Sequence, residues 1–258
     1  MITVFNKYQG TGNDFIVIDN RKGSFNTDDH QLIRNLCDRR FGIGADGLIL
    51  ICTCHDCDFE MRYFNSDGHE GSMCGNGGRC SAAFAIKEGI ADKKMIFKAA
   101  DGAHHAELNN NLISMSMNDI TEYKLIKGNY FLNTGSPHYI IFSKNIEDID
   151  VHKTGKEIRM SPDFSPGGTN VDFVEIFKNQ IFVRTFERGV EEETLSCGTG
   201  VTAAAIASVL SGHFDINNIN VRTKGGDLSV SFKIKDDLVT DIWLTGPATF
   251  VFEGMINI

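Results

Sequence analysis

The chain lacks a long apolar run, a targeting leader and a basic cluster. Its longest apolar stretch, from Val201 to Leu210, is well short of the roughly 20 residues that a membrane helix needs. The N-terminal segment MITVFNKYQGTGNDF has no charged stretch followed by an apolar one, so we expect no signal peptide. The formal net charge of −9 argues against a nucleic-acid groove. We therefore expect a cytoplasmic protein with neither a membrane nor a nucleic acid as its partner.

Composition indicates a folded protein that carries thiols. The 258 residues suffice for one large domain or two of ordinary size. The fractions of 41% hydrophobic and 23% charged residues are typical of globular chains and not of disordered ones. The seven cysteines are an odd number, which, without a signal peptide, predicts reduced thiols in a reducing compartment.

Two segments of the chain resemble each other, and each begins with Cys-Gly. Cys74 opens CGNGGRCSAAFAI, and Cys197, 123 residues later (197 − 74), opens CGTGVTAAAIASVL. Further matches follow in the same order at nearly the same offset: Thr11–Asn13 with Thr134–Ser136, Arg62–Asn65 with Arg184–Glu187, and Ala82 with Ala205. A fixed period predicts two homologous halves. The alternative is that unrelated strand–turn–helix units share Gly and Ala.

Each half is predicted to be rich in strands, with one alanine-rich helix that begins at its Cys-Gly. Apolar runs predict strands at 15–18, 48–52, 59–64, 95–98, 112–117, 139–142, 171–177, 181–186, 219–223, 228–234 and 242–245. A further helix is predicted to start at Thr27 and to end at Gly42. Because the alanine-rich helices carry little charge, we expect each to be buried inside a strongly curved sheet.

The two cysteines suggest acid/base chemistry. A cysteine at a helix N-terminus faces unpaired N–H groups and the positive end of the helix dipole. This predicts that the pKa values of Cys74 and Cys197 fall from about 8.5 toward roughly 3.5–7.5. The N–H groups of Gly75-Asn76 and Gly198-Thr199 form an anion pocket for a carboxylate. Two thiols on opposite faces of the substrate's α-carbon would invert the configuration at that carbon. The alternative is that both cysteines only pack in the core.

Several motifs along the chain resemble the diaminopimelate epimerase family. They are GTGNDF (10–15), FNSDG (64–68), MCGNGGRC (73–80), GTNVDF (168–173), FERG (186–189), SCGTG (196–200) and GPATFVFEG (246–254). The resemblance implies a cofactor-independent epimerase that interconverts LL- and meso-2,6-diaminoheptanedioate in lysine and peptidoglycan precursor biosynthesis. It also implies an α/β fold of two pseudo-symmetric halves, 1–120 and 121–247, each a mixed sheet around a central helix. Strand 248–258 is expected to return to the first half.

The resemblance also implies roles for single residues. Cys74 and Cys197 would be the acid/base pair, and His138 and Glu187 would tune the pKa values of the two thiols. The substrate contacts would come from Asn13, Asn65, Gly75, Asn76, Asn170, Glu187, Arg188, Gly198 and Thr199. The distal end of this diamino-dicarboxylate is itself an amino acid, so Arg188 suits its carboxylate and Glu187 its ammonium.

The chain departs from the family pattern at several positions. Ser136 stands where many members have Asn, and Gly47 where some have Gln, so both contacts are left open. The segment ERGVEEET, just before Cys197, is one residue longer than the common ERGxGET. Phe252 stands where Tyr often supports a dimer interface, which leaves a homodimer open.

One cysteine cluster and three other functions stay as alternatives. The run Cys52–Cys57, CTCHDC, has metal-ligand residue types, but structural zinc sites usually draw on two separated pairs. We expect a hairpin there and no metal.

The chain could instead be a proline racemase-like two-cysteine racemase, a non-catalytic amino-acid binder, or a thiol–disulfide redox protein using Cys74 and Cys197. Asn76, Arg79-Cys80 and Glu187-Arg188 favour the epimerase.

Overall fold

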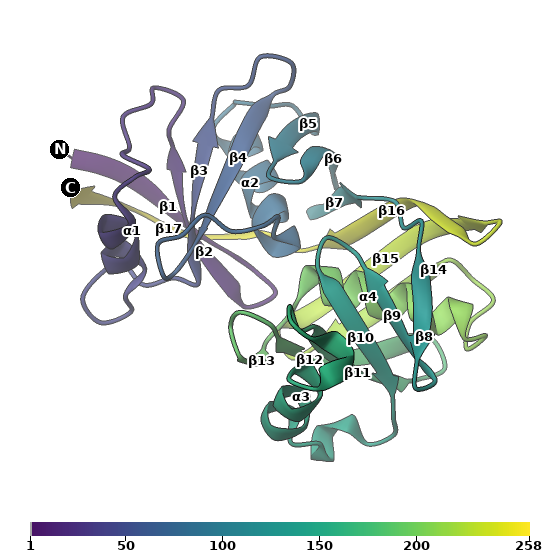
Figure 1. The fold of residues 1–258 in the computed structure, drawn as a ribbon. Helices are drawn as coiled ribbons and strands as arrows, with labels where there is room; N and C mark the ends of the chain where they lie inside the picture. Colours follow the sequence, from purple (N-terminus) through teal and green to yellow (C-terminus); the bar gives the residue numbers. More distant parts are fainter. Residues whose placement is uncertain (1) are drawn as a thin grey trace. The chain divides into compact units, whose positions relative to one another are not determined.

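The computed structural model describes residues 2–258, which divide into two compact units. Unit 1 contains the chain up to Met115 together with Gly246–Ile258, and unit 2 contains Ser116–Thr245. The sequence placed these boundaries at residues 120 and 247. Figure 1 shows the elements of both units along the chain.

Unit 1 is a mixed sheet that packs on helix α2 (Gly75–Lys87). Its strands are β1 (Ile2–Gly10), β2 (Asn13–Asp19), β3 (Gly47–Cys52), β4 (Phe59–Asn65), β5 (Lys94–Ala99), β6 (Gly102–Asn109), β7 (Leu112–Met117) and β17 (Thr249–Asn257). The pairs β2–β3 and β4–β5 are parallel. The pairs β17–β1, β1–β2, β3–β4, β5–β6 and β6–β7 are antiparallel.

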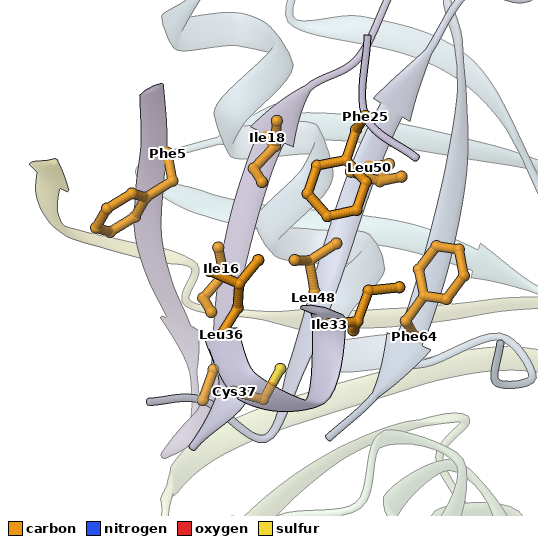
Figure 2. Packing of buried hydrophobic residues seen from close by; sticks show 11 residues of the cluster. Phe5, Ile16, Ile18, Phe25, Ile33, Leu36, Cys37, Leu48, Leu50 and Phe64 are labelled. Atoms are coloured by element: carbon orange, nitrogen blue, oxygen red, sulfur yellow. The ribbon is translucent and has the colours of Figure 1, made fainter. Parts of the chain in front are cut away.

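Helix α1 (His30–Cys37) covers a second apolar layer of unit 1. Its N-cap is Asp29, whose side chain accepts a hydrogen bond from the Leu32 N–H, so the predicted start at Thr27 is two residues early. Ile33 and Leu36 of this helix pack on alternate residues of β2 and β3, including Ile16 and Leu48, as Figure 2 shows. Strands β2 and β3 are buried on both faces, which explains why they read as continuous apolar runs.

Unit 2 repeats this plan around helix α4 (Gly198–Leu210). Its other elements are β8 (Tyr123–Ile126), β9 (Asn129–Asn133), β10 (Pro137–Phe142), α3 (Val151–Arg159), β11 (Asn170–Ile176), β12 (Gln180–Glu187), β13 (Glu192–Thr194), β14 (Asn218–Thr223), β15 (Gly226–Lys235) and β16 (Leu238–Gly246), with 3-10 turns at Ile146–Asp148 and Pro162–Phe164. The pairs β10–β11 and β12–β14 are parallel. The pairs β8–β9, β9–β10, β11–β12, β12–β13, β14–β15 and β15–β16 are antiparallel.

The strand pairing matches the duplication seen in the sequence. Helices α2 and α4 both have 13 residues, and the parallel pair β2–β3 corresponds to β10–β11. The antiparallel pair β8–β9 of unit 2 corresponds to β17–β1 of unit 1. The C-terminal strand therefore occupies in unit 1 the place that β8 occupies in unit 2.

The hairpin between β3 and β4 corrects the expectation that all thiols are reduced. Cys54 and Cys57 form a disulfide with a Cα–Cα separation of 5.4 Å. Their spacing in a short turn brings the two Cα atoms into the range that disulfides span. Cys52 beside them remains a free thiol, as do Cys74 and Cys197. Within residues 2–258, no helix is both long and apolar enough to span a bilayer.

Candidate active site

Both predicted cysteines are the N-cap residues of their helices. The backbone of Cys74 has φ −114° and ψ 115°, and that of Cys197 has φ −115° and ψ 113°. In this extended conformation the Cys74 sulfur accepts a hydrogen bond from the Gly77 N–H at 3.5 Å. The Cys197 sulfur lies 3.3 Å from the Thr199 hydroxyl. The duplicated sequence therefore gives both cysteines the same backbone conformation at a helix start, but only the Cys74 side chain caps its helix.

In unit 1, Cys74 lies beside two asparagine side chains. Its sulfur is 3.6 Å from Asn13 Oδ1, which also accepts a hydrogen bond from Asn76 Nδ2 at 3.2 Å. Asn13 Nδ2 donates to Asp46 Oδ2 at 2.8 Å, and Asp46 forms an ion pair with Arg39 at 2.7 Å. The carboxylate of Asp46 thus fixes the amide that faces Cys74. Sequence reasoning missed Asp46, whose only signal is its place directly before β3.

Asn65 and Gly47 face each other at one end of the β3–β4 pair. Asn65 is exposed there. A Cβ atom on Gly47 would lie 2.5 Å from both the Tyr63 ring and the Phe64 carbonyl oxygen. Tyr63 therefore fills the space that a larger side chain at position 47 would need, which accounts for the departure from the family pattern.

In unit 2, a buried chain of hydrogen bonds leads to Cys197. Asp172 Oδ2 lies 2.7 Å from His138 Nδ1, and His138 Nε2 lies 2.9 Å from the Thr199 hydroxyl, which contacts the Cys197 sulfur. Asp172 and His138 are both fully buried. Thr185 donates a further hydrogen bond to Asp172 Oδ1 at 2.7 Å.

Strand pairing explains how this chain of side chains assembles. His138 of β10 is paired with Asn170 of β11, and Asp172 follows on the same face of β11. Because β10 and β11 are parallel, both begin at the same end of the sheet, where His138 contacts Thr199 in the first turn of α4. Asp172 is a second residue that sequence reasoning missed, although it stands inside the motif GTNVDF.

The predicted lowering of the Cys197 pKa is wrong. Burial raises the pKa of this thiol well above its ordinary value, and the carboxylates of Glu187 and Asp172 raise it further. The hydrogen bonds from Thr199 and from the Gly200 N–H act in the opposite direction but are weaker. Desolvation and like charge thus outweigh the helix N-terminus. Cys197 is a protonated thiol at neutral pH.

Asn170 and Arg188 lie next to this chain. Asn170 Nδ2 donates to the Ser136 hydroxyl at 2.7 Å, and Asn170 Oδ1 accepts from the Arg188 N–H at 2.7 Å. The Arg188 side chain is half-buried and donates one hydrogen bond, to the Gly167 carbonyl at 3.2 Å. This bond uses one of the five N–H donors that a guanidinium carries.

The structure therefore groups the predicted residues in two sets. Unit 1 holds Cys74, Gly75, Asn76 and Asn13 together, with Asn65 at the end of β4. Unit 2 holds the others: His138, Asn170, Glu187, Arg188, Cys197, Gly198 and Thr199. Across residues 2–258, no three His, Cys, Asp or Glu side chains group as metal ligands.

Known proteins resemble this chain over nearly its whole length. The family model for diaminopimelate epimerase matches residues 5–121 and 130–251. A diaminopimelate epimerase from Flavobacterium psychrophilum is 51% identical over 97% of this chain and 98% of its own. One from Chlorobaculum tepidum is 43% identical over 96% of this chain and 99% of its own.

Solved structures show the same fold at low identity. A phenazine biosynthesis protein of the PhzF family from Bacillus anthracis has a TM-score of 0.79 and 15% identity, with all of both chains covered. A probable proline racemase from Agrobacterium radiobacter K84 has a TM-score of 0.74 and 14% identity, with 99% of this chain and 93% of that one covered. With the fold shared this widely, the family model and the close relatives decide the assignment: the chain belongs to the diaminopimelate epimerase family.

Proposed function

We propose that this chain interconverts LL- and meso-2,6-diaminoheptanedioate by proton transfer at one α-carbon between Cys74 and Cys197. The observation that carries the proposal is the pair of N-cap cysteines with matched backbone conformation. The relatives named diaminopimelate epimerase, which cover nearly the whole chain, support this substrate.

The two thiols need opposite protonation states for this reaction. In one direction, the Cys74 thiolate removes the α-proton, so the C–H bond breaks, an S–H bond forms and the electron pair moves into the substrate carboxylate. Cys197, whose pKa is raised by burial, Glu187 and Asp172, then donates its proton to the opposite face and becomes a thiolate. The reverse reaction exchanges the two roles. Both thiols must be reduced, which favours a cytoplasmic setting.

The helix N-termini are suited to the charge that develops on the substrate. The electron pair makes the carboxylate enediolate-like, and the N–H groups at Gly75-Asn76 and Gly198-Thr199 begin two buried helices. Donors held in place for such a charge are each worth about 2.7–4 kcal/mol in comparable sites.

The polar groups of unit 2 are suited to the distal amino-acid head. Arg188 is half-buried and has donors to spare, so it can bind the distal carboxylate through two parallel hydrogen bonds. Asn170 holds the Arg188 backbone, and Glu187 carries the charge that an ammonium group needs. Asn13 and Asn65 of unit 1 are the further amide side chains that the family resemblance assigns to substrate binding.

Isotope exchange tests the proposal. Incubation with LL-diaminopimelate in deuterated water should place deuterium at the α-carbon and yield the meso isomer, detected by NMR and chiral chromatography. Cys74→Ser and Cys197→Ser should each lower the rate at least 100-fold, the usual scale for loss of a general acid or base. Cys52→Ser, which removes a free thiol of the β3–β4 hairpin, is the matched control and should retain activity. Exchange into proline but not into diaminopimelate would refute the assignment in favour of a proline racemase.

We also propose that a second copy of the chain packs against strands β1 and β17. Exposed apolar side chains gather on these two strands: Ile2, Val4, Phe250, Val251, Phe252 and Met255. Phe252 is 44% exposed although its ring contacts that of Phe5. Apolar surface of this kind on paired strands often marks an interface. Sedimentation should show a dimer that Phe252→Glu dissociates, and a monomeric wild-type protein would refute it.

A further inference from the structure

Arg79 is a fully buried cation in helix α2. Its guanidinium donates to the Gly75 carbonyl at 3.2 Å, to Asn76 Oδ1 at 2.9 Å and to the Pro247 carbonyl at 3.4 Å. All three acceptors are neutral, and no carboxylate of the described chain forms an ion pair with it. Because a buried charge is costly without a counter-ion, an anion is expected nearby.

Helix α2 does not itself supply that compensation. Arg79 lies in the N-terminal half of the helix, where the helix dipole disfavours a cation. Burial lowers the pKa of Arg79 to about 10, so the group still carries its charge at neutral pH. The cation therefore depends on a negative group outside the helix backbone.

Thiols are the titratable groups that interact with Arg79, namely Cys80 and Cys74. Burial raises the pKa of Cys80 to about 12, so Cys80 is neutral at physiological pH. Burial likewise raises the pKa of Tyr8, which interacts with Cys80. Cys74 is the remaining group that can become the anion.

Hydrogen bonds connect Arg79 directly to the surroundings of Cys74. The carbonyl of Gly75, the residue after Cys74, accepts from Nη1 of Arg79. Asn76 accepts from Nη2 and donates to Asn13, whose Oδ1 lies 3.6 Å from the Cys74 sulfur. The Arg79 guanidinium thus contacts the residue next to Cys74 in the chain, and the side chains of Asn76 and Asn13 connect it to the Cys74 sulfur.

The second half of the duplication provides an internal comparison. The position that corresponds to Arg79 is Thr202, whose hydroxyl donates to the Gly198 carbonyl at 2.9 Å. That bond matches the one from Arg79 to Gly75, so both halves keep the hydrogen bond but only the first has the charge. In unit 2 the charged groups that act on Cys197 are instead carboxylates, those of Glu187 and Asp172.

We propose that Arg79 is the counter-ion that holds Cys74 as the resting thiolate. Arg79 thereby assigns Cys74 as the first proton acceptor and leaves Cys197 as the donor. It acts through its charge and does not touch the substrate. The catalytic consequence rests on the proposed function, whereas the protonation state of Cys74 can be measured without any substrate.

The pH dependence of alkylation measures this state in the full-length protein. Iodoacetamide reacts with thiolates, and mass spectrometry of the Cys74 and Cys197 peptides gives a separate midpoint for each. In the wild type we expect a Cys74 midpoint below about 7.5. Arg79→Gln should raise it by about one pH unit or more, a tenfold fall in thiolate population. Arg79→Lys should retain most of the effect. The Cys197 midpoint should stay unchanged in both variants.

Thr202→Val is the matched control because it removes the corresponding hydrogen bond without changing any charge. It should leave the Cys74 midpoint unchanged. A wild-type midpoint at or above about 8.5, the value of a free thiol, would overturn the proposal without any variant. An unchanged midpoint in an Arg79→Gln protein with a native circular dichroism spectrum would overturn it too.

If Arg79→Gln does not fold, Cys74→Ser provides the second measurement. A thiol with a depressed folded pKa contributes stability above its unfolded pKa and loses it as the pH falls through the folded pKa. The stability advantage of the wild type over Cys74→Ser should therefore grow between pH 6 and pH 8.5. A constant difference would refute the counter-ion. An inactive enzyme with a low, Arg79-dependent midpoint would instead refute only the proposed function.

Discussion

Asp172 is the residue whose replacement should reveal how unit 2 keeps Cys197 protonated. Its carboxylate is fully buried, contacts His138 at 2.7 Å and accepts a hydrogen bond from Thr185 at 2.7 Å. Asp172→Asn keeps the shape of the side chain and one acceptor oxygen. It removes the negative charge and one of the two hydrogen bonds that the carboxylate makes with His138 and Thr185.

The two effects have predictable sizes and signs. A hydrogen bond to a charged group is worth about 1.5–3 kcal/mol, so loss of one bond of this kind should lower the free energy of unfolding by about 2–3 kcal/mol. For a chain of this size that corresponds to a fall in Tm of about 4–12 °C. The pKa of Cys197 should also fall, because Asp172 is one of the groups that raise it, after burial and Glu187.

Thermal unfolding and Cys197 alkylation together test this reasoning. Asp172→Asn should lower both the Tm and the alkylation midpoint of Cys197. Thr185→Val is the control, because it removes one hydrogen bond to Asp172 but leaves the charge in place. It should lower the Tm without lowering the Cys197 midpoint. A Cys197 midpoint that does not move in a folded Asp172→Asn protein would show that this carboxylate has no influence on the thiol.

Three further predictions follow from the geometry. Gly47→Gln should cost about 1–3 kcal/mol of stability, seen in the Tm, because its Cβ would lie 2.5 Å from the Tyr63 ring; an unchanged Tm would mean that Tyr63 moves freely. Arg188→Ala should lower kcat/KM roughly 10–150-fold, because hydrogen bonds to a charged group contribute about 1.5–3 kcal/mol of binding free energy. A smaller loss would mean that Arg188 does not bind the distal carboxylate. Burial opposes ionisation of Asp14, but Arg39 and Lys7 hold the pKa of this carboxyl at about 2. The ionised Asp14 therefore stabilises the fold above its unfolded pKa of about 3.9, and this stabilisation is lost as the pH falls toward 2. Arg39→Ala should therefore reduce the loss of Tm between pH 4 and pH 2, and an identical acid profile would contradict it.

Local sequence patterns predict much of the secondary structure. The two Cys-Gly helices and most strands were predicted because apolar runs and helix starts depend on neighbouring residues. The apolar runs do not predict β1, β6, β8, β9 or β13, and β17 is expected only from the family resemblance. Strands β8 and β13 have no buried residue, so they carry no apolar pattern. Helix α3 was missed as well, because only Val151 and Gly155 of its residues are buried.

The surroundings of the site depend on contacts that local patterns do not contain. His138, Asp172 and Thr199 meet through the register of β10 and β11 and the start of α4, which separate them by 27 to 61 residues in sequence. The position of Cys197 at a helix start predicts the wrong direction for its pKa for the same reason. Burial and the Glu187 carboxylate are tertiary effects, and they outweigh the local helix dipole.

A two-thiol inversion cannot work if both thiols have the same protonation state. Two thiolates leave no proton to donate, and two thiols leave no base to remove one. Since Cys74 and Cys197 have nearly the same backbone conformation at matched helix starts, the required difference must come from the residues around them. Unit 1 places the cation Arg79 where unit 2 has the neutral Thr202, and unit 2 adds buried negative charge beside Cys197. Duplication alone would make the two thiols equivalent, so the proposed roles of one as base and the other as acid depend on the charge differences at matched positions.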